Sequence, residues 1–362
     1  MNSSGNKSGF RILAVNPGST STKIAFFEDE TQRFSETAAH AVDALRAFQR
    51  ISDQYDFRVH AVESFLARYH IAIPSLDAVV GRGGLLRPVE GGTYAVNDRM
   101  VEDLRNAERG EHASNLGGLI ARSLADKAGV PAYIVDPVVV DELEDVARVS
   151  GLPQTPRRSI FHALNQKAVA RAAALELKRS YSDVNLIVAH LGGGISVGCH
   201  RRGKVVDVNN ALDGDGPFSP ERAGGIPSGQ LMDLCFSGRH SPIELKKMLT
   251  GRGGMVAHLG TNDLREVKER IGAGDVRARL VYDAMLYQII KQIGASAAAL
   301  DGDVQAIVLT GGLAADPEFA GGIAEKVAWI ARVVTVPGEQ EMASLCQGVL
   351  RVLRGQEPVK EY

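Results

Sequence analysis

The sequence predicts an α/β protein with two related domains that face one another across a cleft. Its 362 residues are about twice the length of a domain of roughly 150 residues. Apolar strand-like runs alternate with helical patterns along the chain, which is typical of α/β folds. The two halves of the chain also show a weak internal similarity, because residues 12–27 and 186–200 each contain an apolar strand, a turn of small residues and a second strand.

The first half begins with a predicted β-hairpin, and its other strands are short apolar runs that end near glycine or proline. The spacing of apolar residues predicts two helices in this half. The side chain of Ser114 or Asn115 is expected to cap the second helix by accepting a hydrogen bond from a free N–H group of its first turn. Strands are predicted at 11–15, 24–27, 76–80 and 131–137, and helices at 98–107 and 114–127.

The second half contains the strongest helix signal, over residues 275–300. Tyr282, Leu286, Ile289 and Ile293 recur at the spacing of one buried helix face. A loop rich in glycine, proline and acidic residues is expected at 213–227. Strands are predicted within 186–200 and at 204–208, 304–314 and 332–336, and helices at 157–180, 228–236, 242–250, 261–271, 318–330 and 341–354.

Composition excludes several classes of function. The net charge of -2 gives no reason to expect nucleic acid or an anionic membrane as a partner. No run reaches the ~18 apolar residues of a membrane helix. Three scattered cysteines without a CxxC motif predict neither a disulfide framework nor a zinc site, which fits the cytoplasm. Residues 1–9 are polar and small, so they read as a flexible tail.

The stretch VNPGSTSTK at residues 15–23 could bind phosphate or form an ordinary tight turn. Small residues let backbone N–H groups converge on an anion, but glycine and serine dominate turns in general. A second small-residue turn at 192–194 and the glycine pair 311–312 after a buried strand favour phosphate. The Walker A and GxGxxG patterns are both incomplete, which excludes a P-loop or Rossmann site.

Ten segments, in order over about residues 10–355, together resemble the acetokinase family of the acetate and sugar kinase, heat-shock ATPase and actin superfamily, and within it the branch that acts on butyrate. The segments are NPGSTSTK (16–23), GRGG (81–84), HASN (112–115), VDP (135–137), RRSIFH (157–162), HLGGG (190–194), ERAGG (221–225), GTNDLRE (260–266), TGGLA (310–314) and PGEQEM (337–342).

This resemblance implies two ribonuclease-H-like, or actin-like ATPase, domains that flank a nucleotide cleft. Residues 10–138 with 340–362 would form the carboxylate-side domain, and 139–339 the nucleotide-binding domain. The implied reaction is reversible, direct in-line transfer of a phosphoryl group from Mg-ATP to a short-chain fatty acid, giving an acyl phosphate and ADP. Such an acid has a pKa near 4.3, that of Glu, and is ionised at pH 7, so no general base is needed. The protein must instead align two anions and offset their repulsion.

The resemblance also implies roles for individual residues. The implied catalytic residues are Arg222, Asp136, His190 and His162, and the implied substrate-binding residues are Arg82, Gly83, Gly84 and His112. The nucleotide would be bound by Asn16, Ser19, Gly192, Gly193, Gly194, Asp263, Arg265, Gly311 and Gly312. Mg²⁺ would be bound by Asn16, Asp136 and Glu341, and Glu339 is an alternative to Glu341.

Plainer interpretations stay open for some of these residues. Arg82 could be a surface cation, and Arg222 could pair with Asp213 or Asp215. Each histidine could be a satisfied core residue, and NDLRE at 262–266 could be only a capped helix start.

Gly83 and Gly84 stand where acetate kinases typically carry valines, which predicts room for a longer acyl chain. One buried methylene is worth about 0.8 kcal/mol, so we expect modest selectivity for butyrate or isobutyrate. Kinases for acetate or propionate, an actin-like or heat-shock-like ATPase, and a sugar kinase with Asp136 as base are the alternatives. The resemblance further implies a homodimer or higher oligomer.

Overall fold

The structure, a computed structural model, describes residues 9–362, and it divides into two compact units. The first contains the chain through residue 140 together with residues 340–362, and the second contains residues 141–339. The tail expected at residues 1–9 falls, apart from Gly9, outside the described residues. No helix in the described part is long and apolar enough to span a membrane.

The first unit is built on a six-stranded sheet in the order β3-β2-β1-β4-β6-β5. β1 to β3 are joined as antiparallel neighbours, whereas β1, β4 and β6 run parallel. The strands are β1 (Arg11–Pro17), β2 (Ser21–Glu28), β3 (Thr31–Ala39), β4 (Ala78–Arg82), β5 (Thr93–Ala95) and β6 (Ala132–Val135).

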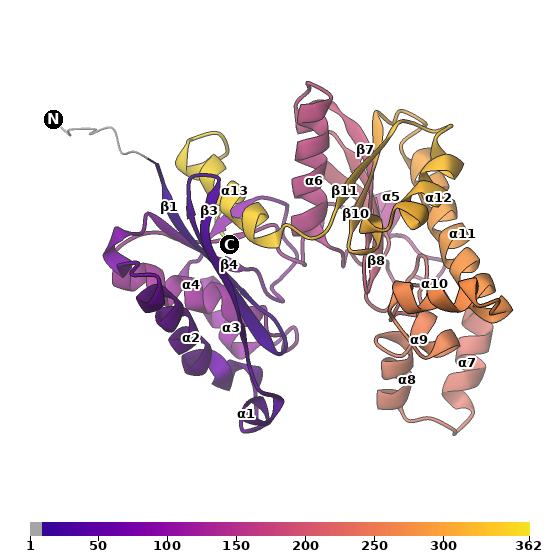
Figure 1. Cartoon of the computed structure of the whole chain (residues 1–362), viewed down its shortest axis with the longest axis horizontal. Helices are drawn as coiled ribbons and strands as arrows, with labels where there is room; N and C mark the ends of the chain where they lie inside the picture. Colours follow the sequence, from indigo (N-terminus) through magenta and orange to yellow (C-terminus); the bar gives the residue numbers. More distant parts are fainter. Residues whose placement is uncertain (1–8) are drawn as a thin grey trace. The chain divides into compact units, whose positions relative to one another are not determined.

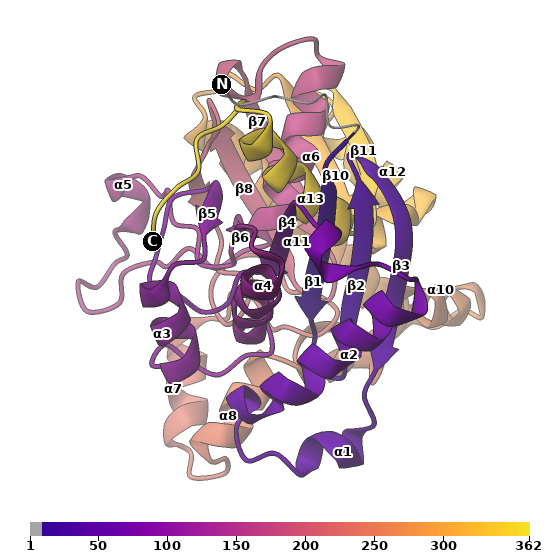
Figure 2. The same ribbon diagram turned by 90° about the vertical axis from the view of Figure 1, so that its left-hand side faces the viewer.

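Helices cover both faces of this sheet (Figures 1 and 2). Leu13 and Val15 belong to the core that includes residues of α2 (Tyr55–Arg68) and α4 (Asn115–Ala128). Strand side chains alternate between faces, and Val135 on the other face contacts Gly348 of α13 (Glu341–Leu353). The remaining helices are α1 (Val42–Arg46), α3 (Asp98–Asn106) and two 3₁₀ turns at Ile51–Gln54 and Ile73–Ser75.

The second unit is built on a five-stranded sheet in the order β11-β10-β7-β8-β9. β7, β8 and β9 are antiparallel neighbours, and β7, β10 and β11 are parallel. This repeats the arrangement of β1 to β4 and β6 in the first unit. The strands are β7 (Asn185–Leu191), β8 (Ile195–Arg201), β9 (Lys204–Val208), β10 (Ala306–Gly311) and β11 (Val333–Pro337).

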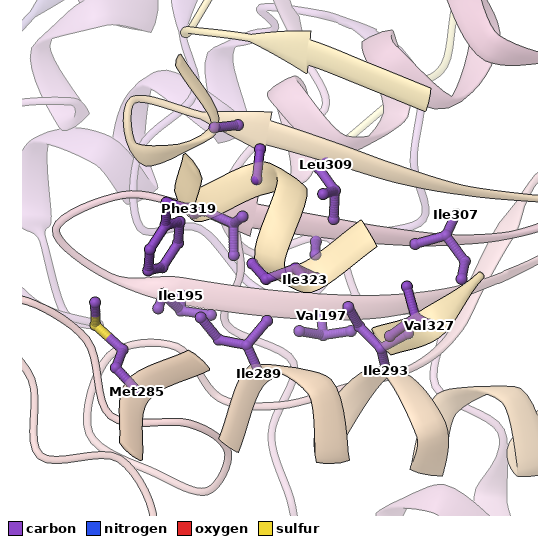
Figure 3. Packing of buried hydrophobic residues seen from close by; sticks show 14 of the residues in the cluster. Ile195, Val197, Met285, Ile289, Ile293, Ile307, Leu309, Phe319, Ile323 and Val327 are labelled. Atoms are coloured by element: carbon purple, nitrogen blue, oxygen red, sulfur yellow. The ribbon is translucent and has the colours of Figure 1, made fainter. Parts of the chain in front are cut away.

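The two faces of the second sheet belong to separate cores. Leu186 and Val188 pack with α6 (Ala163–Glu176), whereas Ile187 and Ala189 face α11 (Val276–Ala299) and α12 (Pro317–Val327). Figure 3 shows Ile289 and Ile293 of α11 pointing into this second core. The other elements are α5 (Asp145–Arg148), α7 (Ser228–Phe236), α8 (Pro242–Leu249), α9 (Gly254–Leu259), α10 (Leu264–Gly272) and 3₁₀ turns at Tyr181–Asp183 and Leu313–Ala315.

The predicted α/β class with two similar units is confirmed, as is the buried face of the 275–300 helix, where Tyr282, Ile289 and Ile293 are buried and Leu286 packs against them. The prediction of one helix over 157–180 was wrong, because the first six of those residues form no regular secondary structure and helix α6 covers only the middle. The expected cap was also wrong: Ser114 makes no capping bond, and Asn115 bonds to Leu85 and Gly110 instead. Elements that the sequence did not predict are β3, β5, α1, α2, α5 and α9.

Candidate active site

In the first unit, three predicted site residues lie at the carboxyl ends of adjacent parallel strands. Asn16 is in β1, Arg82 is the last residue of β4, and Asp136 directly follows β6. Because β4 pairs in parallel with both β1 and β6, all three side chains start from one edge of the sheet. This is the edge at which open α/β sheets bind ligands.

Glu341, the first residue of α13, joins two of them. Its Oε2 accepts a hydrogen bond of 2.5 Å from the Asn16 side-chain amide, and its Oε1 pairs with Arg82. The Glu341 and Arg82 side chains are 16% and 23% exposed. The structure therefore brings Asn16, Arg82 and Glu341 together, and Arg82 is not an isolated surface cation.

Asp136 is buried and held by the loop before β5. Its backbone N–H donates to the Gly92 carbonyl at 2.9 Å, and its Oδ1 accepts from the Gly92 N–H at 2.6 Å. Its φ of +37° lies in the left-handed region, which residues with a side chain rarely adopt. Strained backbone of this kind is frequent at functional sites.

His112 lies near Arg82 and is neutral. Its Nδ1 accepts from the Ser114 backbone N–H at 3.2 Å and lies 2.8 Å from the Ser114 hydroxyl. Burial, and then the positive charge of Arg82, lower the pKa of His112. With Nδ1 serving as an acceptor, the neutral ring carries its proton on Nε2.

Gly83 and Gly84 do not leave free volume beside Arg82. A Cβ on Gly83 would lie 2.5 Å from the Pro137 side chain, and one on Gly84 would lie 2.6 Å from Asn115 Cα. Real Cβ atoms essentially never come this close. The expectation that these glycines make room for a longer acyl chain was therefore wrong: the α4 terminus and Pro137 fill the space.

In the second unit, a cavity of about 580 Å³ collects most of the predicted nucleotide residues. Asp263 caps α10 and pairs with Arg265 at 2.6 Å, and this hydrogen bonding lowers the pKa of Asp263 to about 2. The capped helix start is therefore real, and it also lines the cavity. The lining residues are Gly192, Gly193, Pro220, Glu221, Asn262, Asp263, Leu264, Arg265, Gly312, Leu313, Ala315 and Asp316.

Gly194 and Gly311, which were predicted to bind the nucleotide, do not line this cavity and instead allow close packing of neighbouring groups. A Cβ on Gly194 would collide with the Arg222 guanidinium, and Gly311, with φ of +88°, lies against the backbone of Leu191. Arg222 donates to the Ala211 carbonyl. Among the described residues it forms no ion pair with Asp213 or Asp215, so that interpretation is wrong.

Arg222 is nonetheless half-buried, and this burial lowers its pKa, while the nearby charges of Glu221 and Asp213 act in the opposite direction. An arginine held in this way presents a cation to the small-residue turn at 192–194.

His162 and His190 lie face to face, with ring centroids 3.7 Å apart and an interplanar angle of 9°. His190 Nδ1 is 2.8 Å from Asn165 Oδ1, and its Nε2 is 3.1 Å from Glu339 Oε1. The two competing glutamates thus have different neighbours: Glu339 contacts His190 in the second unit, and Glu341 contacts Asn16 and Arg82 in the first.

No local sequence pattern indicated the polar network behind His162. Ser196 Oγ lies 2.9 Å from His162 Nδ1 and accepts from Gln166 Nε2 at 2.8 Å, and Gln166 Oε1 lies 3.0 Å from His200 Nε2. Because the Ser196 hydroxyl accepts from Gln166, its own proton is available to His162 Nδ1. The local sequence around each of these residues predicts only a strand or a helix and indicates no polar network.

Comparison with known proteins places the chain in a family. The model of the acetokinase family matches residues 153–333. A curated protein of Clostridium acetobutylicum named butyrate kinase 2 is 55% identical over 353 residues, which cover 98% of this chain and 99% of that protein. The chain belongs to the acetokinase family.

Solved structures agree with the fold of this acetokinase. An acetate kinase from Porphyromonas gingivalis aligns with a TM-score of 0.77 at 18% identity, covering 95% of this chain and all of that one. A propionate kinase from Francisella tularensis aligns with a TM-score of 0.71, also at 18% identity, covering 94% of this chain and 98% of that one. At such low identity these likenesses establish the two-unit α/β fold alone.

Proposed function

We propose that this acetokinase transfers the γ-phosphoryl group of ATP to butyrate or isobutyrate, reversibly, forming an acyl phosphate and ADP. The relative named butyrate kinase 2 supports this choice of acid. Family membership favours a carboxylate kinase over an actin-like or heat-shock-like ATPase.

The observation that carries the proposal is the contact between Arg82 and a carboxylate at the ligand-binding edge of the first sheet. In the structure that carboxylate belongs to Glu341, and it is the same chemical group as the proposed substrate. A guanidinium suits a carboxylate because its planar fork can bind both oxygens. Neutral His112 beside it can donate from Nε2, without a second positive charge.

The second unit supplies the nucleotide side in this proposal. Gly192 and Gly193 would approach the phosphates, Asp263 and Arg265 the ribose or adenine, and Gly312 the α-phosphate side of the cavity. Arg222, which packs against Gly194, would stabilise charge on the transferring phosphoryl group. His162 and His190 would act as donors near the same group.

Mg²⁺ is proposed as the metal. Among the described residues no group of three or more His, Cys, Asp or Glu side chains is arranged to hold an ion. Mg²⁺ usually takes only one or two carboxylates and completes its shell with water and phosphate. Glu341 with Asp136 and the amide oxygen of Asn16 fits this sparse oxygen set; the ion, when bound, would neutralise phosphate charge.

We also propose a homodimer or larger homo-oligomer in the cytoplasm. Apolar side chains on one side of α11 stay uncovered: Val276, Leu280 and Tyr287 are 80%, 58% and 62% exposed. The helices α7 and α8 contribute no buried residue. The three cysteines are free thiols, which fits a reducing compartment.

The direct test of this function is to trap the product. The full-length protein is incubated with Mg-ATP, butyrate and hydroxylamine, and both the hydroxamate and ADP are measured. We expect one hydroxamate per ADP, and an R82Q variant with a much higher KM for butyrate but a similar KM for ATP. ADP release that is independent of any acid, without hydroxamate, would contradict the proposal.

A further inference from the structure

A fully buried arginine lies behind the turn that joins β1 to β2. Arg58 is on α2 and has an exposure of 0%. All five of its guanidinium N–H groups are used. Nη1 donates to the Ser21 carbonyl at 2.8 Å and to Thr22 Oγ1 at 3.1 Å, Nη2 to the Ser19 carbonyl at 3.2 Å and to Gln54 Oε1 at 2.9 Å, and Nε to Gln54 Oε1 at 3.1 Å.

Every one of these acceptors is neutral. Among residues 9–362, no carboxylate forms an ion pair with Arg58. The nearby His40, whose Nε2 lies 2.8 Å from Thr22 Oγ1, has its pKa lowered by burial and then by the charge of Arg58, so it stays neutral. Arginine is almost never fully buried without a partner of opposite charge. Within the described residues only neutral acceptors stabilise this cation, so its charge stays available to attract an anion.

The contacts of Arg58 also fix the shape of the turn. The Gly18 N–H bonds to the Ser21 carbonyl at 2.8 Å, and Ser19 and Thr20 are exposed at its tip. The carbonyl and the following N–H of a trans peptide point in opposite directions. By holding the Ser19 carbonyl, Arg58 turns the Thr20 N–H away from itself, so that it can meet a ligand on the other side of the turn.

We propose that Arg58 is a positioning residue whose unpaired charge is balanced by a phosphate group bound at the turn of residues 17–21. This rests on the proposed function in taking that turn as a phosphate site. The guanidinium acts through the backbone it holds and through its field; it does not touch the reacting atoms.

An isosteric substitution tests the charge without disturbing the shape. Gln54→Glu places a carboxylate where Gln54 Oε1 already accepts two hydrogen bonds from Arg58, and so gives the cation an internal partner. The matched control is Gln32→Glu, which adds the same charge at an exposed position of β3 in the same unit.

The probe is inorganic phosphate, and the signal is the Gly18 amide resonance of full-length protein labelled with ¹⁵N-glycine. A Gly18→Ala variant assigns that resonance, because the added Cβ would meet only ordinary contacts of 3.5 Å and longer. We expect a saturable shift in the unmodified protein and in Q32E, and an affinity about tenfold weaker in Q54E, the equivalent of about 1.4 kcal/mol. Equal affinity in Q54E, or no Gly18 shift in the unmodified protein, would overturn the proposal.

A second pair of variants keeps the proposal testable if Q54E does not fold. Arg58→Lys retains the charge without the planar fork and should keep a saturable Gly18 response, whereas the neutral Arg58→Met should lose it. Equal responses in the two would overturn the proposal. Because phosphate binding is measured without any acid, a protein that forms no acyl phosphate could still show the Arg58 effect, so the two failures can be told apart.

Discussion

The side-chain amide of Asn16 donates a hydrogen bond of 2.5 Å to Glu341, which lies 325 residues later in the chain. The same carboxylate pairs with Arg82. The start of α13 therefore completes a site whose other members lie on β1 and β4, and it does so within the first unit. Glu339, two residues earlier, belongs to the second unit and contacts His190.

This division predicts different outcomes for the two glutamates. Glu341→Gln removes the charge that Arg82 and Asn16 hold, so we expect kcat to fall about 100-fold, as for loss of one electrostatic group in an active site, and the Mg²⁺ requirement to rise. Glu339→Gln should leave the Mg²⁺ dependence unchanged. Titration of MgCl₂ at saturating ATP measures both, and a larger Mg²⁺ effect in E339Q would show that the metal role is assigned to the wrong residue.

Gly84→Ala should destabilise the protein and leave its choice of acid unchanged. The added Cβ would come within 2.6 Å of Asn115 Cα, and such overpacking typically costs about 1–3 kcal/mol. Urea unfolding gives the cost, and Gly151→Ala, whose Cβ would meet nothing within 4 Å, is the control. A stable G84A variant with preference shifted toward shorter acids would restore the idea that this glycine shapes the acyl pocket.

Asp263 is predicted to serve both helix and nucleotide, and two variants separate these roles. Asn is as good an N-cap as Asp, whereas Ala is not, so Asp263→Asn keeps the α10 cap and Asp263→Ala loses it. Both should raise the KM for ATP and leave the KM for the acid unchanged. Because the pKa of Asp263 is lowered to about 2, the difference between D263N and the unmodified protein should be constant above about pH 4. A KM for ATP that is unchanged in D263N would remove Asp263 from the nucleotide site.

His200 should make the second unit sensitive to acid. Burial, and then the charges of Lys167 and Arg171, hold the pKa of His200 well below its usual value of 6.5. Below about pH 6.5 the unfolded chain therefore binds a proton at His200 that the folded chain does not bind. The free energy of unfolding consequently decreases as the pH falls below 6.5. Because the unfolded histidine titrates near pH 6.5, its contribution to the loss at pH 5 has an upper limit of about 2 kcal/mol.

Urea unfolding at pH 7.5 and pH 5.0 measures this loss. A His200→Gln variant, which cannot titrate, should be less stable at pH 7.5 because its contact with Tyr181 is lost, but it should lose less stability between the two pH values. An equal loss in both proteins would mean that His200 does not carry the effect.

Strands and turns with strong local signals were predictable from sequence. The hairpins around residues 16–21 and 191–195 and the buried face of α11 are examples. The strand β3 was not predicted because it is an edge strand of mostly exposed polar residues. It lacks the alternation of apolar and polar residues that marks a half-buried strand. The helix α2 was not predicted because no side chain caps its start. Its apolar face also includes the buried Arg58, and an arginine in a sequence normally indicates a surface position.

The site was predictable only as a set of residues. The family resemblance supplied Arg82, Glu341 and Asp263, but no local pattern shows that Glu341 meets Asn16, or that Gly84 is pressed against Asn115. Those facts depend on how distant segments pack. The environment of a buried polar side chain such as Gln166 is likewise set by its neighbours in space.

The most direct test of the account is the catalytic efficiency, kcat/KM, with Mg-ATP across acetate, propionate, butyrate, isobutyrate and valerate, with glucose as a non-carboxylate control. The account predicts the highest value at a four-carbon acid, measurable but lower values for propionate and valerate, and none for glucose. The highest value for acetate would contradict the proposed substrate, and turnover with glucose alone would contradict the carboxylate kinase itself.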